Sequence, residues 1–283
     1  MRARKIIGFT ARHLLLALLA AFWLIPILWL VVTSLGVDRG PNIASFFPKS
    51  WTLAHYRAIL QPGGDTVNQF PQWFLNTFVI AAFTCVISTL FVLTTAYAMS
   101  CMRFKARRPL MNVAIVLNLF PGFLSMIAVY FIMKTIGLTN TMTGMVVVYS
   151  ASSGLGYLIA KGFFDTISRS LREAAYLEGA NEFTVFRRII LPLAKPIVVY
   201  TVINSFLAPW MDFVFASLML NSGVSSQKTV ALGLFSMVDK VNRNSYFAQF
   251  CAGGVVVSIP ISALFVIMQR FYVEGITGGS GKG

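Results

Sequence analysis

The residues that could do chemistry in this chain are few and widely separated. Its 283 residues include nine Asp and Glu, two His and three Cys. His13 and His55 belong to no cluster with the spacing of metal ligands. Cys85, Cys101 and Cys251 have no paired spacing and lie in or beside apolar runs, so we expect buried thiols that pack as small hydrophobic groups. The sequence predicts no metal site, no cofactor and no enzymatic nucleophile or acid pair.

One acid is notable because it lies inside an apolar run. Asp212 occurs in APWMDFVFASL. A carboxylate within a membrane is costly to bury, and by default it is a candidate for a functional role. The alternative is a structural acid near the outer end of its span, facing the bundle interior or water. Asp212 is therefore a candidate either for lining the transport pathway or for a structural role within the membrane.

The C-terminal GGSGKG superficially resembles a phosphate-binding loop. That loop requires Gly, four residues, and then Gly-Lys-Ser/Thr. Here the position five before Gly281 is Ile276, and Lys282 is followed by Gly283. We expect a flexible tail at this end and no ATP site in the chain, which is therefore predicted not to be an enzyme.

The composition indicates a membrane protein. Hydrophobic residues make up 57% of the chain and charged residues 11%, whereas soluble domains have about a quarter charged residues. The net charge of +14 could suggest nucleic-acid binding. The basic residues form short clusters between apolar runs instead, which is typical of charges that set membrane topology, so we expect no nucleic-acid partner.

Six apolar segments are long enough to cross a bilayer, which takes about 20 helical residues. They cover residues 13–35, 72–99, 110–133, 143–163, 196–220 and 246–269. The first follows MRARK and could be a signal peptide, but its apolar run is too long and no clear cleavage pattern ends it, so we expect a retained span. The sequence thus predicts an all-α membrane protein with six transmembrane helices.

The fourth predicted span contains a run of small residues, SASSGLG, from Ser150 to Gly156. Small side chains allow membrane helices to approach closely, and they could instead line a polar pathway. Close packing is the commoner outcome, so we assign no pathway residue here.

Lys and Arg are distributed unequally between the two sides of the six spans. One side receives 16 of the 23, and the other side, with loops 36–71, 134–142 and 221–245, receives seven. The positive-inside rule therefore predicts that both termini are cytoplasmic, together with the segment from Glu173 to Pro192.

This segment, EAAYLEGANEFTVFRRIILP, has the signals of two short helices. Ser170 and Glu173 match the capping-box pattern at the start of the first, and Gly179 suits a helix stop. Asn181 can cap the second helix, and Pro192 and Pro196 would end it or mark the entry into the fifth span. Three roles remain open on physical grounds: an interfacial amphipathic helix, a solvated helical loop, or a helix that docks into a groove on a partner.

The spacing within this segment resembles the EAA loop of ATP-binding-cassette (ABC) importer permeases. The resemblance rests on Glu173-Ala174-Ala175, three residues, Gly179, nine residues, Ile189, one residue and Leu191-Pro192. It implies the type I importer permease fold and a segment that docks into a cytoplasmic ATPase. The residues it implies for ATPase coupling are Glu173, Ala174, Ala175, Tyr176, Gly179, Ala180, Ile189, Leu191 and Pro192.

The whole chain is also similar to the smaller, MalG-like permease of maltose-type carbohydrate importers. This likeness rests on the six spans, the long loop after the first, and the ending QRFYVEGITGGSGKG. It implies import of a sugar, such as a maltodextrin or galacto-oligosaccharide, across the cytoplasmic membrane of a bacterium or archaeon. The implied partners are a second, MalF-like permease, two copies of an ABC ATPase and an extracytoplasmic sugar-binding protein.

The implied organisation has three parts: an N-terminal span and outer loop over residues 1–71, an ABC transmembrane type-1 domain over 72–269 with its EAA loop at 164–195, and a cytoplasmic tail over 270–283. Two alternatives stay open for the function. One is an ABC permease for a non-sugar solute, such as glycerol phosphate or a polyamine. The other is an ion-coupled carrier, which would need intramembrane charges, of which only Asp212 is offered.

Overall fold

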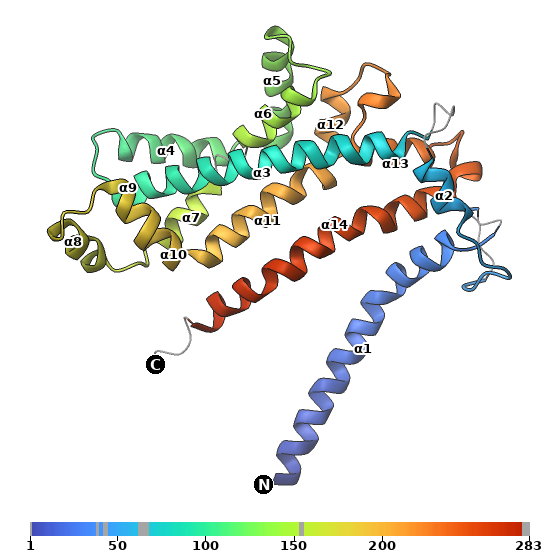
Figure 1. Ribbon diagram of the computed structural model, residues 1–283, viewed down its shortest axis with the longest axis horizontal. Helices are drawn as coiled ribbons and strands as arrows, with labels where there is room; N and C mark the ends of the chain where they lie inside the picture. The colour runs from blue at the N-terminus through green and yellow to red at the C-terminus, as the bar shows by residue number, and fades with distance from the viewer. Residues whose placement is uncertain (1, 38–39, 42–44, 62–67, 153–155, 279–283) are drawn as a thin grey trace. The chain divides into compact units, whose positions relative to one another are not determined.

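The computed structural model describes the chain except for residues 1, 38–39, 42–44, 62–67, 153–155 and 279–283, and it leaves out the side chains of residues 2–8, 11 and 270–278. Within the described residues every regular element is a helix, and an isolated bridge joins Gly36 to Trp51 (Figure 1). The elements are α1 (Arg2–Ser34), α2 (Ala54–Leu60), α3 (Phe70–Cys101), α4 (Arg107–Asn118), α5 (Gly122–Thr135), α6 (Met142–Ser152), α7 (Tyr157–Phe164), α8 (Arg169–Leu177), α9 (Glu182–Val185), the π-helical turn η2 (Phe186–Ile190), α10 (Leu191–Leu193), α11 (Lys195–Met211), α12 (Val214–Met219), the 3-10 turn η3 (Ser225–Gln227), α13 (Val230–Met237) and α14 (Arg243–Gly278).

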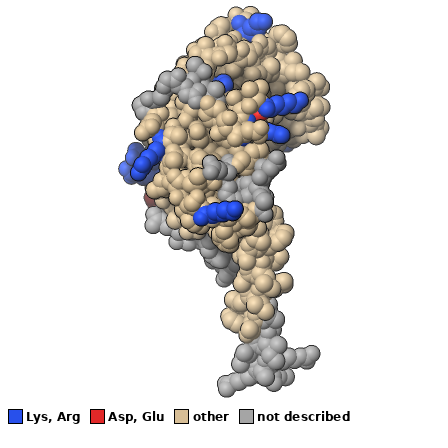
Figure 2. Space-filling model, turned by 90° about the vertical axis from the view of Figure 1, so that its right-hand side faces the viewer, with Lys and Arg blue, Asp and Glu red and all other residues tan. Residues whose placement is uncertain are grey.

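The helices can supply the predicted spans. Among the described residues, four are long and apolar enough to cross a membrane: Arg12–Ser34, Phe70–Cys101, Met142–Phe164 and Arg243–Gln269. Two bent pairs, Arg107–Asn118 with Gly122–Thr135 and Glu182–Leu193 with Lys195–Met211, bring the number to six when each pair counts as one span. Large apolar side chains such as Phe22 (68% exposed) and Trp23 (73%) stand outward on the first of them, as lipid contact requires. On the face shown in Figure 2, uncharged residues predominate and basic side chains lie in separate places.

Two sequence-based expectations about these elements are wrong in detail. The third predicted span bends by 106° between α4 and α5, where Pro121 precedes α5 and cannot continue the helical hydrogen bonds. The fifth predicted span, 196–220, stops at Met211 and resumes as α12, because Asp212 leaves the helical conformation. The GGSGKG tail lies outside the described residues except for Gly278, at which α14 ends.

The chain forms two compact units, each described by itself. The first contains residues 1–71 and 233–259. There the end of α1 is held to α2 by a hydrogen bond of 2.6 Å between the hydroxyls of Ser34 and Tyr56. Gly253 on α14 lies so close to Leu234 and Phe70 that a methyl group would approach a Leu234 carbon to 2.5 Å.

The second unit contains residues 72–232 and 260–283 and is organised along α3. Two buried clusters lie on this helix. One includes Ile80 with side chains of α5, α6 and α12, and the other includes Val92 to Met99 with side chains of α7, α8 and the turns before α11. Within this unit, α8 and α9 lie at the C-terminal end of α3 (Figure 1).

Candidate functional site

Residues 169–193, here called the α8–α10 segment, contain the whole EAA pattern from Glu173 to Pro192. The segment begins with α8. The structure corrects the predicted start of this helix. Ser168, not Ser170, precedes the helix and accepts a hydrogen bond from the Ser170 amide at 3.3 Å. Glu173 is therefore in the second turn and is too far along to complete a capping box. The Ser170 hydroxyl instead contacts that of Ser168 at 2.7 Å.

The end of α8 has the geometry predicted for Gly179. Its φ is +85°, a conformation that residues with a Cβ rarely adopt. The Gly179 amide donates to the Tyr176 carbonyl at 3.0 Å, and the Ala180 amide donates to the Ala175 carbonyl at 2.9 Å. This pair of bonds is a Schellman motif, which satisfies the last carbonyls of the helix. Gly179 thus sets the turn from α8 into α9.

The second half of the segment starts at Asn181, as expected. Its side-chain oxygen accepts from the Thr184 amide at 2.8 Å and so caps α9. The helix then widens into η2, continues as α10, and bends by 85° before α11. The bend falls at Ala194, and Pro196 lies in the first turn of α11, where its missing amide proton costs nothing.

The members of the EAA pattern divide into an inner and an outer set. Ala175 is buried in the cluster at the end of α3, and three others pack against that cluster: Ala180, Ile189 and Leu191. The outer set is exposed and consists of Glu173, Ala174, Tyr176, Gly179 and Pro192. Two neighbours of the outer set are strongly exposed although apolar, Leu177 at 91% and Phe183 at 66%. One side of the segment is therefore anchored, and the other presents exposed apolar side chains among charged ones such as Glu173 and Glu178.

Polar contacts of Tyr97 and Arg172 join the segment to α3. The Tyr97 hydroxyl donates a short hydrogen bond to a Glu182 carboxylate oxygen, although 85 positions separate the two residues. Arg172 of α8 donates to the Cys101 carbonyl, the last residue of α3, at 3.1 Å. Sequence reasoning missed these partners, since nothing local marks Tyr97 or Glu182 as a pair. The one local signal was a tyrosine hydroxyl near the end of a mostly apolar span.

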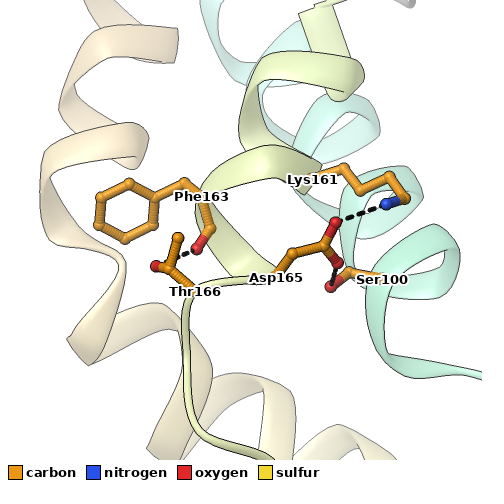
Figure 3. A network of polar contacts seen from close by, with 5 residues as sticks. All are labelled: Ser100, Lys161, Phe163, Asp165 and Thr166. Atoms are coloured by element: carbon orange, nitrogen blue, oxygen red, sulfur yellow. Dashed lines mark hydrogen bonds and ion pairs between the residues drawn. The ribbon is translucent and has the colours of Figure 1, made fainter.

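A further contact ties α3 to α7 just before the segment. The Asp165 carboxylate accepts from the Ser100 hydroxyl and from the Lys161 ammonium, each at 2.6 Å (Figure 3). Partial burial raises the pKa of Asp165. The hydrogen bonds from Lys161 and Ser100, together with the positive charge of Lys161, outweigh this effect and hold the pKa below its usual value. Asp165 is therefore ionised at neutral pH.

Asp212 lies at the break between α11 and α12. Its carboxylate accepts from the amides of Phe215 at 3.0 Å and Ala216 at 3.2 Å, in the first turn of α12, and from the Tyr149 hydroxyl at 2.7 Å. These bonds satisfy amides that a helix start leaves free. Asp212, Tyr149 and Ser152 also line a cavity of about 510 Å³. Of the small-residue run, positions 153–155 lie outside the described residues.

Within the described part of the chain, no group of three or more His, Cys, Asp or Glu side chains is placed to hold a metal ion. Cys251 is buried, and Cys85 and Cys101 are half-buried. The α8–α10 segment combines anchored helices with exposed apolar side chains at its outer edge.

Comparison with known proteins decides the family. Residues 93–277 match the family described as binding-protein-dependent transport system inner membrane component. The chain belongs to this family. Its membership confirms the predictions of a membrane-embedded transport permease and of an ABC importer permease, made from the spans and the EAA spacing.

Relatives of this permease extend over nearly its whole length. The galactooligosaccharides transport system permease protein GanQ of Bacillus subtilis (strain 168) is 33% identical, with 100% of this chain and 99% of the relative covered. The maltodextrin transport system permease protein MdxG of the same organism is 30% identical over 96% of this chain and 95% of the relative. The maltose/maltodextrin transport system permease protein MalG of Escherichia coli (strain K12) is 32% identical, with 96% and 95% covered.

A solved structure supports the fold of the permease. It is described as a bacterial ABC transporter involved in the import of the acidic polysaccharide alginate. Its similarity has a TM-score of 0.78 at 22% identity and covers 96% of this chain and 98% of that one. The predicted all-α importer permease fold is thereby confirmed.

Proposed function

We propose that this permease imports a di- or oligosaccharide, such as a maltodextrin or a galacto-oligosaccharide, across the cytoplasmic membrane. The observation that carries this proposal is full-length similarity to permeases named for galactooligosaccharides and maltodextrin. The alternative solutes, glycerol phosphate or a polyamine, have no such support. An ion-coupled carrier is disfavoured because the carboxylate of Asp212 is occupied by helix amides and a hydroxyl.

The proposed assembly contains a second, MalF-like permease, two copies of a cytoplasmic ABC ATPase and an extracytoplasmic sugar-binding protein. ATP hydrolysis would belong to the ATPase subunits, with none in this chain. We assign residues 1–71 to the first span and outer loop, 72–269 to the transmembrane type-1 domain, and 270–283 to the cytoplasmic end. The outer loop 221–245 is the proposed contact for the binding protein, and its start is held to α3 by bonds from Trp73 to Ser225 and from Asn76 to Ser226.

In this proposal the α8–α10 segment docks into the ATPase. Its support is the division of the segment into an anchored side and an exposed apolar side, with Leu177 and Phe183 outermost. An exposed apolar helix edge is the kind of surface that enters a groove on a partner. Closure of the ATPase dimer would move the segment, and the bonds Tyr97–Glu182 and Arg172–Cys101 would pass the movement to α3. The spans then rock between inward- and outward-facing states.

Replacement of Gly179 tests the docking role. Gly179→Pro fixes φ near −65°, and Gly179→Asp adds a side chain at a φ of +85°, so either should disturb the turn that joins α8 to α9. We expect sugar uptake to fall to background while the permease still inserts into the membrane. The matched control is Gly162→Ala, since Gly162 is in α7 and has no atom within 4 Å of an added Cβ. Uptake by the Gly179 variants at the rate of the control would refute the docking role.

The solute is tested separately. In the complex reconstituted with its binding protein, candidate sugars are added one at a time and ATP hydrolysis is measured. We expect stimulation by one class of oligosaccharide and none by glycerol phosphate or a polyamine. Stimulation by one of the latter alone would contradict the sugar assignment and would leave the docking role intact.

A further inference from the structure

A basic pocket lies beside the α8–α10 segment. It has a volume of about 430 Å³ and is lined by side chains from the end of α3, the connection to α4, α8 and α9. We call it the arginine pocket, after Arg103, Arg107, Arg169 and Arg172. These arginines come from two stretches of the sequence more than 60 positions apart, so the fold, and not a local charge run, brings them together.

The positive charge of the pocket is not balanced by the side chains that the structure describes. Glu173 and Glu182 also line it, but the Glu182 carboxylate already accepts from the Tyr97 hydroxyl. In the described part of the chain the one ion pair joins Lys161 to Asp165, so no pocket arginine has an ion-pair partner there. Four guanidinium groups against two carboxylates leave an excess of donors and of charge that suits an anion.

The residue types favour a phosphate group. Arginine presents a planar fork of donors that matches a phosphate in a bidentate manner, whereas lysine acts as a point charge. All four basic residues of the pocket are arginine, and neither Lys105 nor Lys161 lines it although both are close in sequence.

The position of the pocket favours a phosphate at the membrane surface. Cys101 lines the pocket and is also the last residue of the apolar span Phe70–Cys101. Met102 lines it too and is 37% exposed, and Phe104, two residues on, is 40% exposed. The pocket therefore lies where a span ends, with apolar side chains at its edge that can contact an acyl chain.

We propose that the arginine pocket binds the phosphate of an anionic phospholipid. The headgroup phosphate occupies the space between the guanidinium groups, and the acyl chains run beside Met102 and the end of α3. Basic pockets at the ends of membrane helices bind anionic headgroups in this way. Arg169, Arg172 and Glu173 of α8 form part of the pocket wall. The bound lipid therefore holds the α8–α10 segment at the membrane surface.

The test uses the complete transporter, purified with its partner subunits in mild detergent. Retained phosphatidylglycerol is counted by native mass spectrometry, without sugar or ATP, so the result is independent of the proposed function. The test variant is Arg103→Gln/Arg169→Gln, because both side chains are exposed and neither makes a hydrogen bond within the described residues. The control is Arg187→Gln/Arg188→Gln, which removes the same charge from exposed residues of the same segment outside the pocket.

We expect the pocket variant to retain about tenfold less phosphatidylglycerol than the control variant, whose retention stays near that of the wild type. The second measurement is thermal unfolding in nanodiscs of zwitterionic lipid. Phosphatidylglycerol should raise the Tm of the wild type and the control but not of the pocket variant.

Three outcomes would overturn the proposal. The first is equal retention of phosphatidylglycerol by the pocket and control variants. The second is stabilisation by inorganic phosphate alone that equals that by the lipid, which would make free phosphate the ligand. The third is unchanged lipid retention with loss of the ATPase subunit from the pocket variant, which would mean that the arginines receive acidic side chains of that subunit.

Discussion

The hydroxyl of Tyr97 is the smallest group on which the attachment of the α8–α10 segment depends. Tyr97 is buried, and its bond to the Glu182 carboxylate is the one side-chain pair that we find between the core of α3 and α9 in the described chain. Tyr97→Phe removes that bond and keeps the ring, which packs on Phe186 with centroids 4.9 Å apart. We expect a loss of about 1–3 kcal/mol in unfolding free energy, because the bond is to a charged group. Thermal unfolding of the purified complex measures it.

The same variant also tests whether movement of the α8–α10 segment is transmitted to α3. With the segment held less firmly, sugar imported per ATP hydrolysed should fall, while ATP hydrolysis itself continues. The control is Tyr130→Phe, since Tyr130 makes a ring contact with Phe131 and no described hydroxyl bond. If Tyr97→Phe matched this control in both unfolding free energy and sugar imported per ATP, the Tyr97–Glu182 bond would neither stabilise the protein nor transmit movement.

Asp165 predicts a specific pH dependence. Its pKa is lowered in the folded protein, so its ionised form contributes stability at any pH above the ordinary value of 3.8, and that contribution is lost as the pH falls through the lower folded pKa. Asp165→Asn should therefore lower Tm by the same amount across neutral and mildly acidic pH. Below 3.8 the difference between variant and wild type should shrink. A difference that disappears already at mildly acidic pH would show that Lys161 and Ser100 do not stabilise the carboxylate.

Single residues show which parts of the site the sequence can predict. Gly179 and Asn181 were predictable because helix caps are local chemistry, read from a few neighbours. The start of α8 was assigned two residues late, because Ser168 and Ser170 are both good capping residues and only the backbone decides between them. Tyr97–Glu182 and Ser100–Asp165 were not predictable, since pairs 85 and 65 positions apart exist only once the helices have packed.

At the scale of elements, the break at Asp212 bears on whether this acid is structural or takes part in transport. The carboxylate caps α12 through Phe215 and Ala216, and it accepts from Tyr149. Asp212→Asn keeps an acceptor oxygen and removes the charge, so import should stay within about threefold of the wild type. Asp212→Ala removes every acceptor and should cost about 1–2 kcal/mol of unfolding free energy. Sugar uptake and thermal unfolding measure the two effects.

The two Asp212 variants separate the alternatives left open by the sequence. A charge that takes part in transport would make Asp212→Asn inactive in a complex of normal stability. A cap makes the neutral variant active and the truncated variant unstable. We expect the second pattern, because the carboxylate accepts from the Phe215 and Ala216 amides and from the Tyr149 hydroxyl.

Helix existence was predictable from hydropathy, and helix bending was not. Each apolar run has enough residues to span, which length alone establishes. The bends of 106° after α4 and 85° before α11 occur beside Pro121 and Pro196, but a proline in a membrane segment can start a helix, kink it or leave it nearly straight. Which of these occurs depends on contacts between residues distant in the sequence, which hydropathy does not display.

At the scale of the whole molecule, the orientation in the membrane is the expectation on which most of the proposed function depends. It comes from the unequal division of 23 basic residues, 16 against seven. The structure offers two well-exposed positions for a direct test: Leu177 at the end of α8, 91% exposed, and Val241 between α13 and α14, 85% exposed. Either can carry a single cysteine once Cys85, Cys101 and Cys251 are replaced by serine.

Labelling with a membrane-impermeant maleimide then reports the side on which each position lies. In intact spheroplasts, Val241→Cys should react and Leu177→Cys should not, because the positive-inside rule places the α8–α10 segment in the cytoplasm. After permeabilisation, Leu177→Cys should react when the ATPase has been stripped from the membranes and should be protected when it is present. The opposite pattern in spheroplasts would reverse the orientation and exclude docking of this segment into a cytoplasmic ATPase. Equal labelling with and without the ATPase would preserve the orientation but remove Leu177 from the proposed docking surface.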